Sequence, residues 1–136
     1  MHSTARRPRV PIPAELEGIA KLAVDAAFSV HSRLGPGLLE SVYEICLIHE
    51  LQKRELSVER QVVLPVVYDD IRVENAFKID ILVNKCLVIE LKAVEVLLPV
   101  HRSQLLTYLK LTGHRLGLLI NFNVPLIKEG VERVVF

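Results

Sequence analysis

Cysteine is scarce in this chain of 136 residues, and its two cysteines, Cys46 and Cys86, form no CxxC pair. This pattern provides neither a disulfide framework nor a zinc knuckle, and free thiols are typical of a reducing cytosol. Long apolar runs are also lacking, because a charge or a proline interrupts each run well before the ~18 residues that a membrane span requires. The N-terminus has no secretory apolar core. We therefore expect a soluble, cytoplasmic protein with no membrane partner.

An excess of charge of one sign is lacking as well, since 17 basic and 16 acidic residues give a formal net charge of +1. Such a protein has no strong global field that attracts nucleic acid, so any such binding must come from a local patch. The chain contains no nucleotide-binding glycine loop, no GxSxG elbow and no closely paired histidines of a helical zinc motif. Mechanisms with a Ser or Cys nucleophile therefore have no support.

The composition is that of a folded domain, with 51% hydrophobic and 24% charged residues. At this length we expect one compact domain, which we place at residues 13–136. The first thirteen residues contain three arginines and three prolines, and we predict a flexible N-terminal arm over residues 1–12. The mean hydropathy is positive, which is compatible with a homodimer.

Apolar periodicity and the positions of glycine and proline predict seven main elements. They are a helix from Pro13 to the LGPGL segment at 34–38, a helix from about Leu38 to Glu55, strands at 58–68, 72–83 and 87–94, a helix from Pro99 to Gly113, and a strand at 116–122. Pro65 requires an edge position or a bulge in its strand. The last residues, 131–136, form either a short edge strand or a docked tail. This order predicts a single α/β domain with a mixed β-sheet flanked by helices.

Charged residues interrupt two of the apolar strands, in the segment KIDILVNKCLVIELK at residues 78–92. A carboxylate within a β-core is costly unless it is paired or coordinates a metal. Asp80 and Glu90, with Lys92 at the next alternate position, therefore suggest a metal site and phosphodiester chemistry. An ordinary cross-strand ion pair is the alternative explanation of these charges.

Side-chain alternation predicts one aliphatic face on each of these two strands. The aliphatic sets are Ile79, Ile81 and Val83 on the first strand and Leu87, Ile89 and Leu91 on the second. A two-residue turn at residues 84–85 sets Asp80 opposite Ile89. A three-residue loop at residues 84–86 instead sets Asp80 opposite Glu90, on the same face. We predict the three-residue loop or an equivalent bulge.

Two opposed carboxylates repel each other unless a cation lies between them. Mg²⁺ or Mn²⁺ satisfies that requirement, with Asp80, Glu90 and the carbonyl group of Leu91 as the expected ligands. Lys92 is then placed to position or deprotonate the attacking water and to stabilise developing charge.

Helical spacing adds further candidates. Gln104 and Tyr108 share one face of the third helix, where we expect contact with substrate or with the lysine, an ordinary amphipathic surface being the alternative. Glu40 and Tyr43 share a stripe at the start of the second helix, where a carboxylate also complements the helix dipole. We add Tyr43 and Arg102 to Tyr108 as expected substrate contacts.

The segment GLLESVY resembles a known pattern, because Gly37, Glu40 and Tyr43 match the signature of the GxxExxY protein family. That family is similar to a small branch of the PD-(D/E)XK nuclease superfamily, and the resemblance spans about residues 28–130. It implies a restriction-endonuclease-like core of order αβββαβ with an extra N-terminal helix.

The resemblance also implies roles for individual residues. Carried over position by position, Asp80 matches the lone aspartate of the superfamily, and Glu90 and Lys92 match the ExK positions. Glu40 matches the additional helix carboxylate. Gln104 and Tyr108 resemble a QxxxY motif. One departure is Ile79, which stands where the name of the superfamily has proline. That proline is frequently absent, so the departure does little harm to the implied site.

These features together predict a divalent-metal-dependent nuclease that hydrolyses phosphodiester bonds of nucleic acid, with DNA as the expected partner. The alternative is a catalytically silent module of the same fold that binds nucleic acid or a protein, which the near-zero net charge favours. A basic patch of Lys78, Lys92, Arg102 and Lys110 would serve that module. A homo-oligomeric structural protein is a third hypothesis, and dimerisation is compatible with all three.

Overall fold

Five strands and three helices follow the predicted order in the computed structural model, which describes residues 10–136. The helices are α1 (Ala14–Leu34), α2 (Glu40–Lys53) and α3 (Pro99–Thr112), the strands are β1 (Val58–Tyr68), β2 (Ile71–Val83), β3 (Leu87–Lys92), β4 (Leu116–Asn121) and β5 (Val131–Val135), and a short 3₁₀ helix, η1, spans Ile127–Glu129. Residues 1–9, and with them most of the predicted flexible arm at 1–12, lie outside the described residues.

Glycines end two of the helices where the sequence predicts it. Gly35 and Gly37 between α1 and α2 have φ angles of 67° and 99°, and Gly113 after α3 has a φ of 77°. Side chains with a Cβ rarely adopt this left-handed region, whereas glycine enters it without a steric penalty. The Gly35 N–H bonds the carbonyl group of His31, and the Gly113 N–H bonds that of Leu109, which satisfies two helix-end carbonyl groups.

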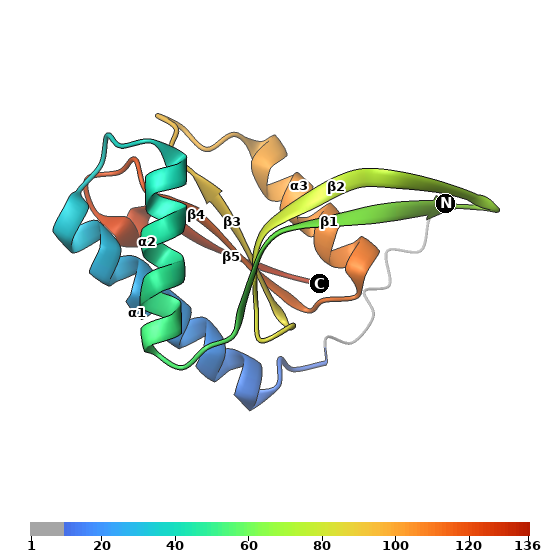
Figure 1. Ribbon diagram of the computed structural model, residues 1–136, viewed down its shortest axis with the longest axis horizontal. Coiled ribbons are helices and arrows are strands. Elements are labelled where there is room, and N and C mark those ends of the chain that lie inside the picture. The colour runs from blue at the N-terminus through green and yellow to red at the C-terminus, as the bar shows by residue number, and fades with distance from the viewer. Residues whose placement is uncertain (1–9) are drawn as a thin grey trace, which may run out of the picture.

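The strands form one mixed sheet of order β1-β2-β3-β4-β5, in which only β3 and β4 are parallel. A parallel pair needs a crossover connection, and α3 provides it. Helices α1 and α2 cover one face of the sheet and α3 covers the other (Figure 1). The fold is thus the expected single α/β domain with a mixed sheet flanked by helices. Within the part of the chain that the structure describes, each helix is too short or too polar for a membrane span.

A long two-stranded hairpin leaves the sheet on the α3 side (Figure 1). Pairing of β2 with β3 ends at Ile81 and Ile89, whereas pairing of β2 with β1 continues out to Tyr68 and Ile71. We call residues 62–79 the hairpin arm. Its inner half packs on α3 through an apolar cluster that includes Phe77 of the arm. The predicted irregularity at Pro65 is confirmed, because β1 is an edge strand and its register shifts between residues 64 and 66.

The arm corrects one expectation about the faces of β2. Ile81 and Val83 pack toward α1 and α2 as predicted, but Ile79 packs toward α3, so the prediction of one aliphatic face is wrong at Ile79. The change of face occurs at Asp80, which lies across from Gln61 in the pairing of β1 with β2. Gln61 has a φ of 51°, far from an extended strand, and the hairpin bends there toward α3.

Two further differences concern the ends of strands. β3 stops at Lys92 instead of residue 94, because the side chain of Asn121 bonds both the N–H and the carbonyl group of Val94. Residues 131–135 form the edge strand β5, antiparallel to β4, which decides between the two predicted alternatives. The 3₁₀ helix η1 was not expected.

Candidate functional site

A three-residue loop connects β2 and β3, as the sequence predicts. Val83 pairs with Leu87, and the intervening residues 84–86 form the turn, in which Asn84 and Lys85 have φ angles of 48° and 56°. Two more pairs follow, the last being Ile81 with Ile89. The predicted three-residue loop is thus confirmed, and regular pairing ends one position before Asp80 and Glu90, where each side chain contacts the backbone of the facing strand.

The two carboxylates replace the backbone pairing where β2 and β3 separate. Asp80 Oδ2 accepts a hydrogen bond from the N–H of Leu91 at 2.9 Å, and Glu90 Oε1 accepts one from the N–H of Asp80 at 3.2 Å. N–H and C=O groups of one strand residue point to the same side, so the Leu91 carbonyl group also faces this gap. Three oxygen-bearing groups therefore converge at the base of the hairpin arm.

Glu90 is buried, and its surroundings change its acidity. Loss of solvent, followed by the negative charge of Asp80, raises the pKa of Glu90 to about 8. The positive charge of Lys92 opposes the shift without cancelling it. A carboxyl group held in this way is protonated at neutral pH unless a cation is present to favour the ionised form.

Glu40 and Lys92 complete a charged cluster around Asp80 and Glu90. Glu40 is the first residue of α2, and burial together with the charge of Asp80 raises its pKa, while Lys92 and Lys78 act in the opposite direction. Lys92 ends β3 and is half-buried. Neither Lys78 nor Lys92 makes an ion pair with any acid of residues 10–136. The family resemblance alone implies the approach of α2 to the strands, and the sequence places Lys78 only in the predicted basic patch.

Gln104 and Tyr108 lie on the side of α3 that faces the hairpin arm. The side-chain amide of Gln104 donates a hydrogen bond to the Tyr108 hydroxyl at 2.8 Å, and the Tyr108 ring stacks on Phe77 with centroids 4.8 Å apart. Burial and the negative charge of Glu90 raise the pKa of Tyr108. Tyr108 therefore lies near Glu90, with Gln104 bonded to it, while their expected contact with substrate or with the lysine stays a prediction.

Arg102 points toward another part of the molecule. Its Nε atom forms an ion pair with Glu132 of β5 at 2.6 Å. This contact directs the guanidinium to the β5 edge of the sheet, whereas Gln104 faces the arm at the opposite edge. The structure does not bring Arg102 together with the other predicted site residues.

Tyr43 is buried in full and has a structural role. Its hydroxyl donates to the carbonyl group of Gly35 at 2.6 Å and accepts from the N–H of Leu38 at 3.1 Å, while its ring stacks on Phe122 at 4.7 Å. Phe122 in turn donates its N–H to the carbonyl group of Lys92 at 2.9 Å. In place of the substrate contact that we expected, Tyr43 fixes the start of α2, and thus Glu40, relative to the end of β3.

Asn121 is a structural residue of the site that sequence reasoning missed. It is buried at the end of β4, where its Nδ2 donates to the Val94 carbonyl at 2.9 Å and its Oδ1 accepts from the N–H groups of Val94 and Asn123. This clamp holds the chain that follows Lys92. The available signal was a polar residue at the end of the apolar run LGLLIN.

The donor set fits a hard divalent cation. Asp80, Glu90 and the Leu91 carbonyl group supply only oxygen, and two neighbouring carboxylates of which one has a strongly raised pKa are stabilised by a shared positive charge. Among the described residues, no three His, Cys, Asp or Glu side chains are grouped to hold a metal ion. The two carboxylates would therefore need water, substrate phosphate or an approach of Glu40 to complete an octahedral shell.

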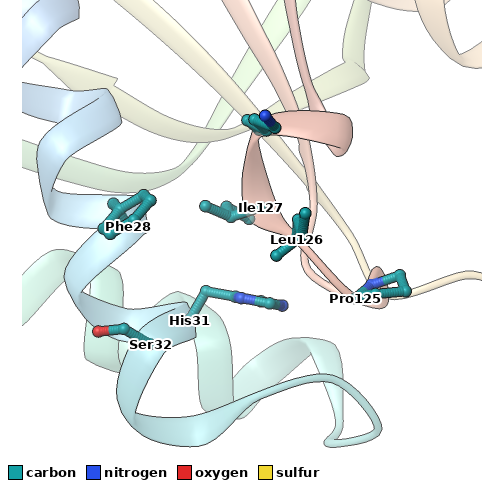
Figure 2. Close-up of a pocket in the computed structure, with 7 residues that line it drawn as sticks. Phe28, His31, Ser32, Pro125, Leu126 and Ile127 are labelled. Carbon is teal, nitrogen blue, oxygen red and sulfur yellow. The ribbon is translucent and has the colours of Figure 1, made fainter.

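A separate hollow lies between α1 and the chain around η1 (Figure 2). It has a volume of about 400 Å³ and is lined mainly by apolar groups, with Phe28 and His31 facing Leu126 and Ile127. The His31 ring lies 2.7 Å, through Nε2, from the carbonyl oxygen of Val124. None of the predicted site residues lines this hollow, and its histidine is already engaged.

Comparison with known proteins identifies a family for this chain. Residues 17–134 match the PD-(D/E)XK nuclease superfamily, and this span includes both carboxylates, the lysine of β3, helices α2 and α3 and most of α1. Neither curated proteins nor solved structures give a match. The match covers most of the 136 residues, and the fold has the expected mixed sheet with helices on both faces. The chain belongs to the PD-(D/E)XK nuclease superfamily.

Proposed function

We propose that the chain is a divalent-metal-dependent nuclease that hydrolyses phosphodiester bonds of nucleic acid, with DNA as the expected substrate, at a centre formed by Asp80 and Glu90. The observation that carries the proposal is the meeting of these two carboxylates where β2 and β3 separate, with Glu90 buried and its pKa raised to about 8. Membership of a nuclease superfamily supports the same chemistry.

Each residue of the centre has a role that follows from its position. Asp80, Glu90 and the Leu91 carbonyl group would hold Mg²⁺ or Mn²⁺, which supplies charge stabilisation at the phosphate and lowers the pKa of bound water. Lys92 Nζ orients the attacking water and stabilises the negative charge that develops on the phosphate.

The residues on the two helices support this centre. Glu40 adds negative charge beside Asp80, and Gln104 with Tyr108 forms a hydrogen-bonded pair next to Glu90 that is suited to hold a substrate phosphate or orient Lys92. The signature made by Gly37, Glu40 and Tyr43 supports assignment to the GxxExxY family within the superfamily.

Cleavage assays with purified protein test the proposal. Single-stranded, double-stranded and branched DNA and RNA are incubated with Mg²⁺ or Mn²⁺, and we expect cleavage that EDTA abolishes. Asp80→Ala and Glu90→Ala should lower the rate by at least ~10²-fold, because each removes charge stabilisation of the transition state. Asp25→Ala, which removes an exposed carboxylate of α1, is the matched control.

Two results would reject the nuclease assignment. Cleavage that persists in EDTA, or at full rate in both carboxylate variants, is one of them. Failure to cleave any of these substrates is the other, and no metal binding by calorimetry would then favour the catalytically silent module, which the low net charge of +1 also favours.

A further inference from the structure

Helix α2 carries a buried acid, Glu44, that has no role in the proposed centre. It lies one turn after Glu40 and is only 7% exposed. A carboxylate removed from water is costly unless it has partners, and the partners of Glu44 come from β1. The side-chain amide of Gln61 donates to Oε1 at 2.9 Å and to Oε2 at 3.1 Å, and Arg60 Nε lies 3.4 Å from Oε1. Glu44 therefore ties α2 to the strand at the base of the hairpin arm.

Gln61 has an uncommon backbone conformation at the bend of β1. Its φ of 51° lies in the left-handed region, which residues with a Cβ rarely adopt. The strand turns there out of the sheet and into the hairpin arm (Figure 1). Such a conformation persists only where the surrounding structure holds it, and it is typical of functional sites. The two hydrogen bonds to Glu44 hold the side chain of this residue.

Asp80 lies across from Gln61 and is outside the regular pairing on both sides. The pairing of β1 with β2 skips the step between these two residues, and the pairing of β2 with β3 stops one step short of Asp80. Its position depends instead on two other contacts, because Oδ2 accepts from the N–H of Leu91 and its own N–H donates to Glu90. A shift of β1 at Gln61 would therefore move Asp80 with no regular pairing to resist it.

We propose that Glu44 is a positioning residue of the nuclease centre, because its bonds to Gln61 hold the bend of β1 and the bend holds Asp80 where it binds the divalent cation together with Glu90. The inference rests on the proposed function, since it concerns the same two carboxylates. Glu44 acts through Gln61 and touches neither cation nor substrate. Removing a side chain that orients a metal ligand typically lowers metal affinity by about 10- to 100-fold.

The Mg²⁺ affinity of the protein, measured by calorimetry, tests this role. Glu44→Ala should weaken Mg²⁺ binding at least ~10-fold. Glu44→Gln keeps an oxygen that accepts from the Gln61 amide, so its loss should stay below ~3-fold. Glu50→Ala is the matched control, because Glu50 is a buried acid of the same helix, 6% exposed, with Lys53 and Arg54 as its partners. It should lower the melting temperature as Glu44→Ala does and leave Mg²⁺ affinity unchanged.

A double variant tests whether Glu44 acts through Gln61. Glycine adopts a φ of this sign without strain, so Gln61→Gly removes the contact to Glu44 and keeps the backbone conformation accessible. It should weaken Mg²⁺ binding about as much as Glu44→Ala. The combination of both substitutions should bind no more weakly than Gln61→Gly alone. Losses that add up in the double variant would contradict this route.

Hydrogen exchange in EDTA separates the inference from the nuclease itself. The N–H of Leu91 is bonded by Asp80 Oδ2, so displacement of Asp80 should speed exchange at Leu91 by at least ~10-fold in Glu44→Ala. Amide groups in the middle of α1 report global opening, and Glu50→Ala should leave the ratio of the two rates unchanged. A wild type that binds no Mg²⁺ would overturn the proposed function and the metal role of Glu44, whereas exchange would still decide whether Glu44 holds Asp80.

Three results would overturn the inference. One is equal Mg²⁺ affinity in Glu44→Ala and the wild type, and another is unchanged exchange at Leu91 in that variant. The third is a loss of Mg²⁺ affinity in Glu50→Ala as large as that in Glu44→Ala, which would reduce the effect to a loss of stability.

Discussion

At the residue scale, burial beside Asp80 raises the pKa of Glu90 from its ordinary value of 4.5 to about 8. The unfolded chain exposes the same carboxyl group to water and releases its proton at the lower pH. Between these values the native state binds a proton that the unfolded state does not. The free energy of unfolding of the metal-free protein therefore falls as pH rises from about 4.5 to 8.

Replacing the titrating group should remove this dependence. Glu90→Gln keeps the shape of the side chain but cannot ionise, so we expect the decrease in unfolding free energy between pH 5 and 8 to shrink by roughly 3 kcal/mol. Urea unfolding in EDTA across this range measures it. Glu129→Gln, at an exposed position, should leave the slope of the wild type unchanged. An identical slope for Glu90→Gln would contradict the raised pKa.

A cation should reverse the destabilisation at high pH. Mg²⁺ that binds Asp80 and Glu90 in the native state alone adds about 1.4 kcal/mol to the free energy of unfolding at tenfold excess over its dissociation constant. Thermal or urea unfolding at pH 8, with and without Mg²⁺, measures this. Asp80→Asn should abolish the gain, and an equal gain in that variant would place the cation elsewhere.

Local rules predicted the carboxylate pair because Asp80 and Glu90 are only 10 residues apart in the sequence. The length of the loop was sufficient to bring Asp80 close to Glu90. The same rules failed for Tyr43 and Arg102, because their partners come from elements far along the chain. Phe122 and Glu132 lie in segments that no turn rule connects to these residues.

At the scale of elements, the connection between α1 and α2 depends on one hydroxyl group. Tyr43→Phe keeps the ring stack on Phe122 but removes the bonds to Gly35 and Leu38. We expect a loss of about 1 to 2 kcal/mol, since the backbone groups lose a buried partner. Tyr68→Phe, at an exposed position of β1, should change the unfolding free energy by less than about 0.5 kcal/mol.

The contact between β4 and the chain before β5 is sensitive to a single methyl group. A Cβ at Gly130 would lie 2.1 Å from the backbone oxygen of Asn121, so the backbone must shift to admit it. Gly130→Ala should destabilise the protein by at least about 2 kcal/mol. Gly18→Ala, at an open position in the second turn of α1, should instead stabilise by about 0.5 to 1 kcal/mol. Effects of the same sign in urea unfolding would contradict this packing.

The order of the elements was predictable because residues that begin or end helices mark the boundaries. Gly35 and Gly113 end helices, and Pro99 begins one. The bend of the hairpin arm was not predictable from the sequence. It depends on Gln61 adopting a positive φ, which is uncommon for a residue with a side chain and has no sequence signal. Ile79 consequently packs on α3, contrary to the alternation rule.

At the scale of the whole molecule, charge pairing limits how nucleic acid is bound. The net charge is only +1, and arginines on β1, β2, α3 and β5 are already paired with acids. Lys78 and Lys92 are the cations that lie beside the carboxylates and make no ion pair within residues 10–136. Within residues 10–136 the base of the hairpin arm therefore offers few phosphate contacts, and binding there should respond weakly to salt.

The salt dependence of binding measures the number of these contacts. For the cleavage-deficient Asp80→Asn protein on duplex DNA, two contacts predict a slope of log affinity against log salt near about −2, at ~0.9 for each phosphate contact. Removing Lys78 by Lys78→Ala in that background should bring the slope to about −1. Lys128→Ala, which removes an exposed lysine of η1, should leave it at about −2. Equal slopes for the Lys78 and Lys128 variants would mean that phosphate binds away from the base of the hairpin arm.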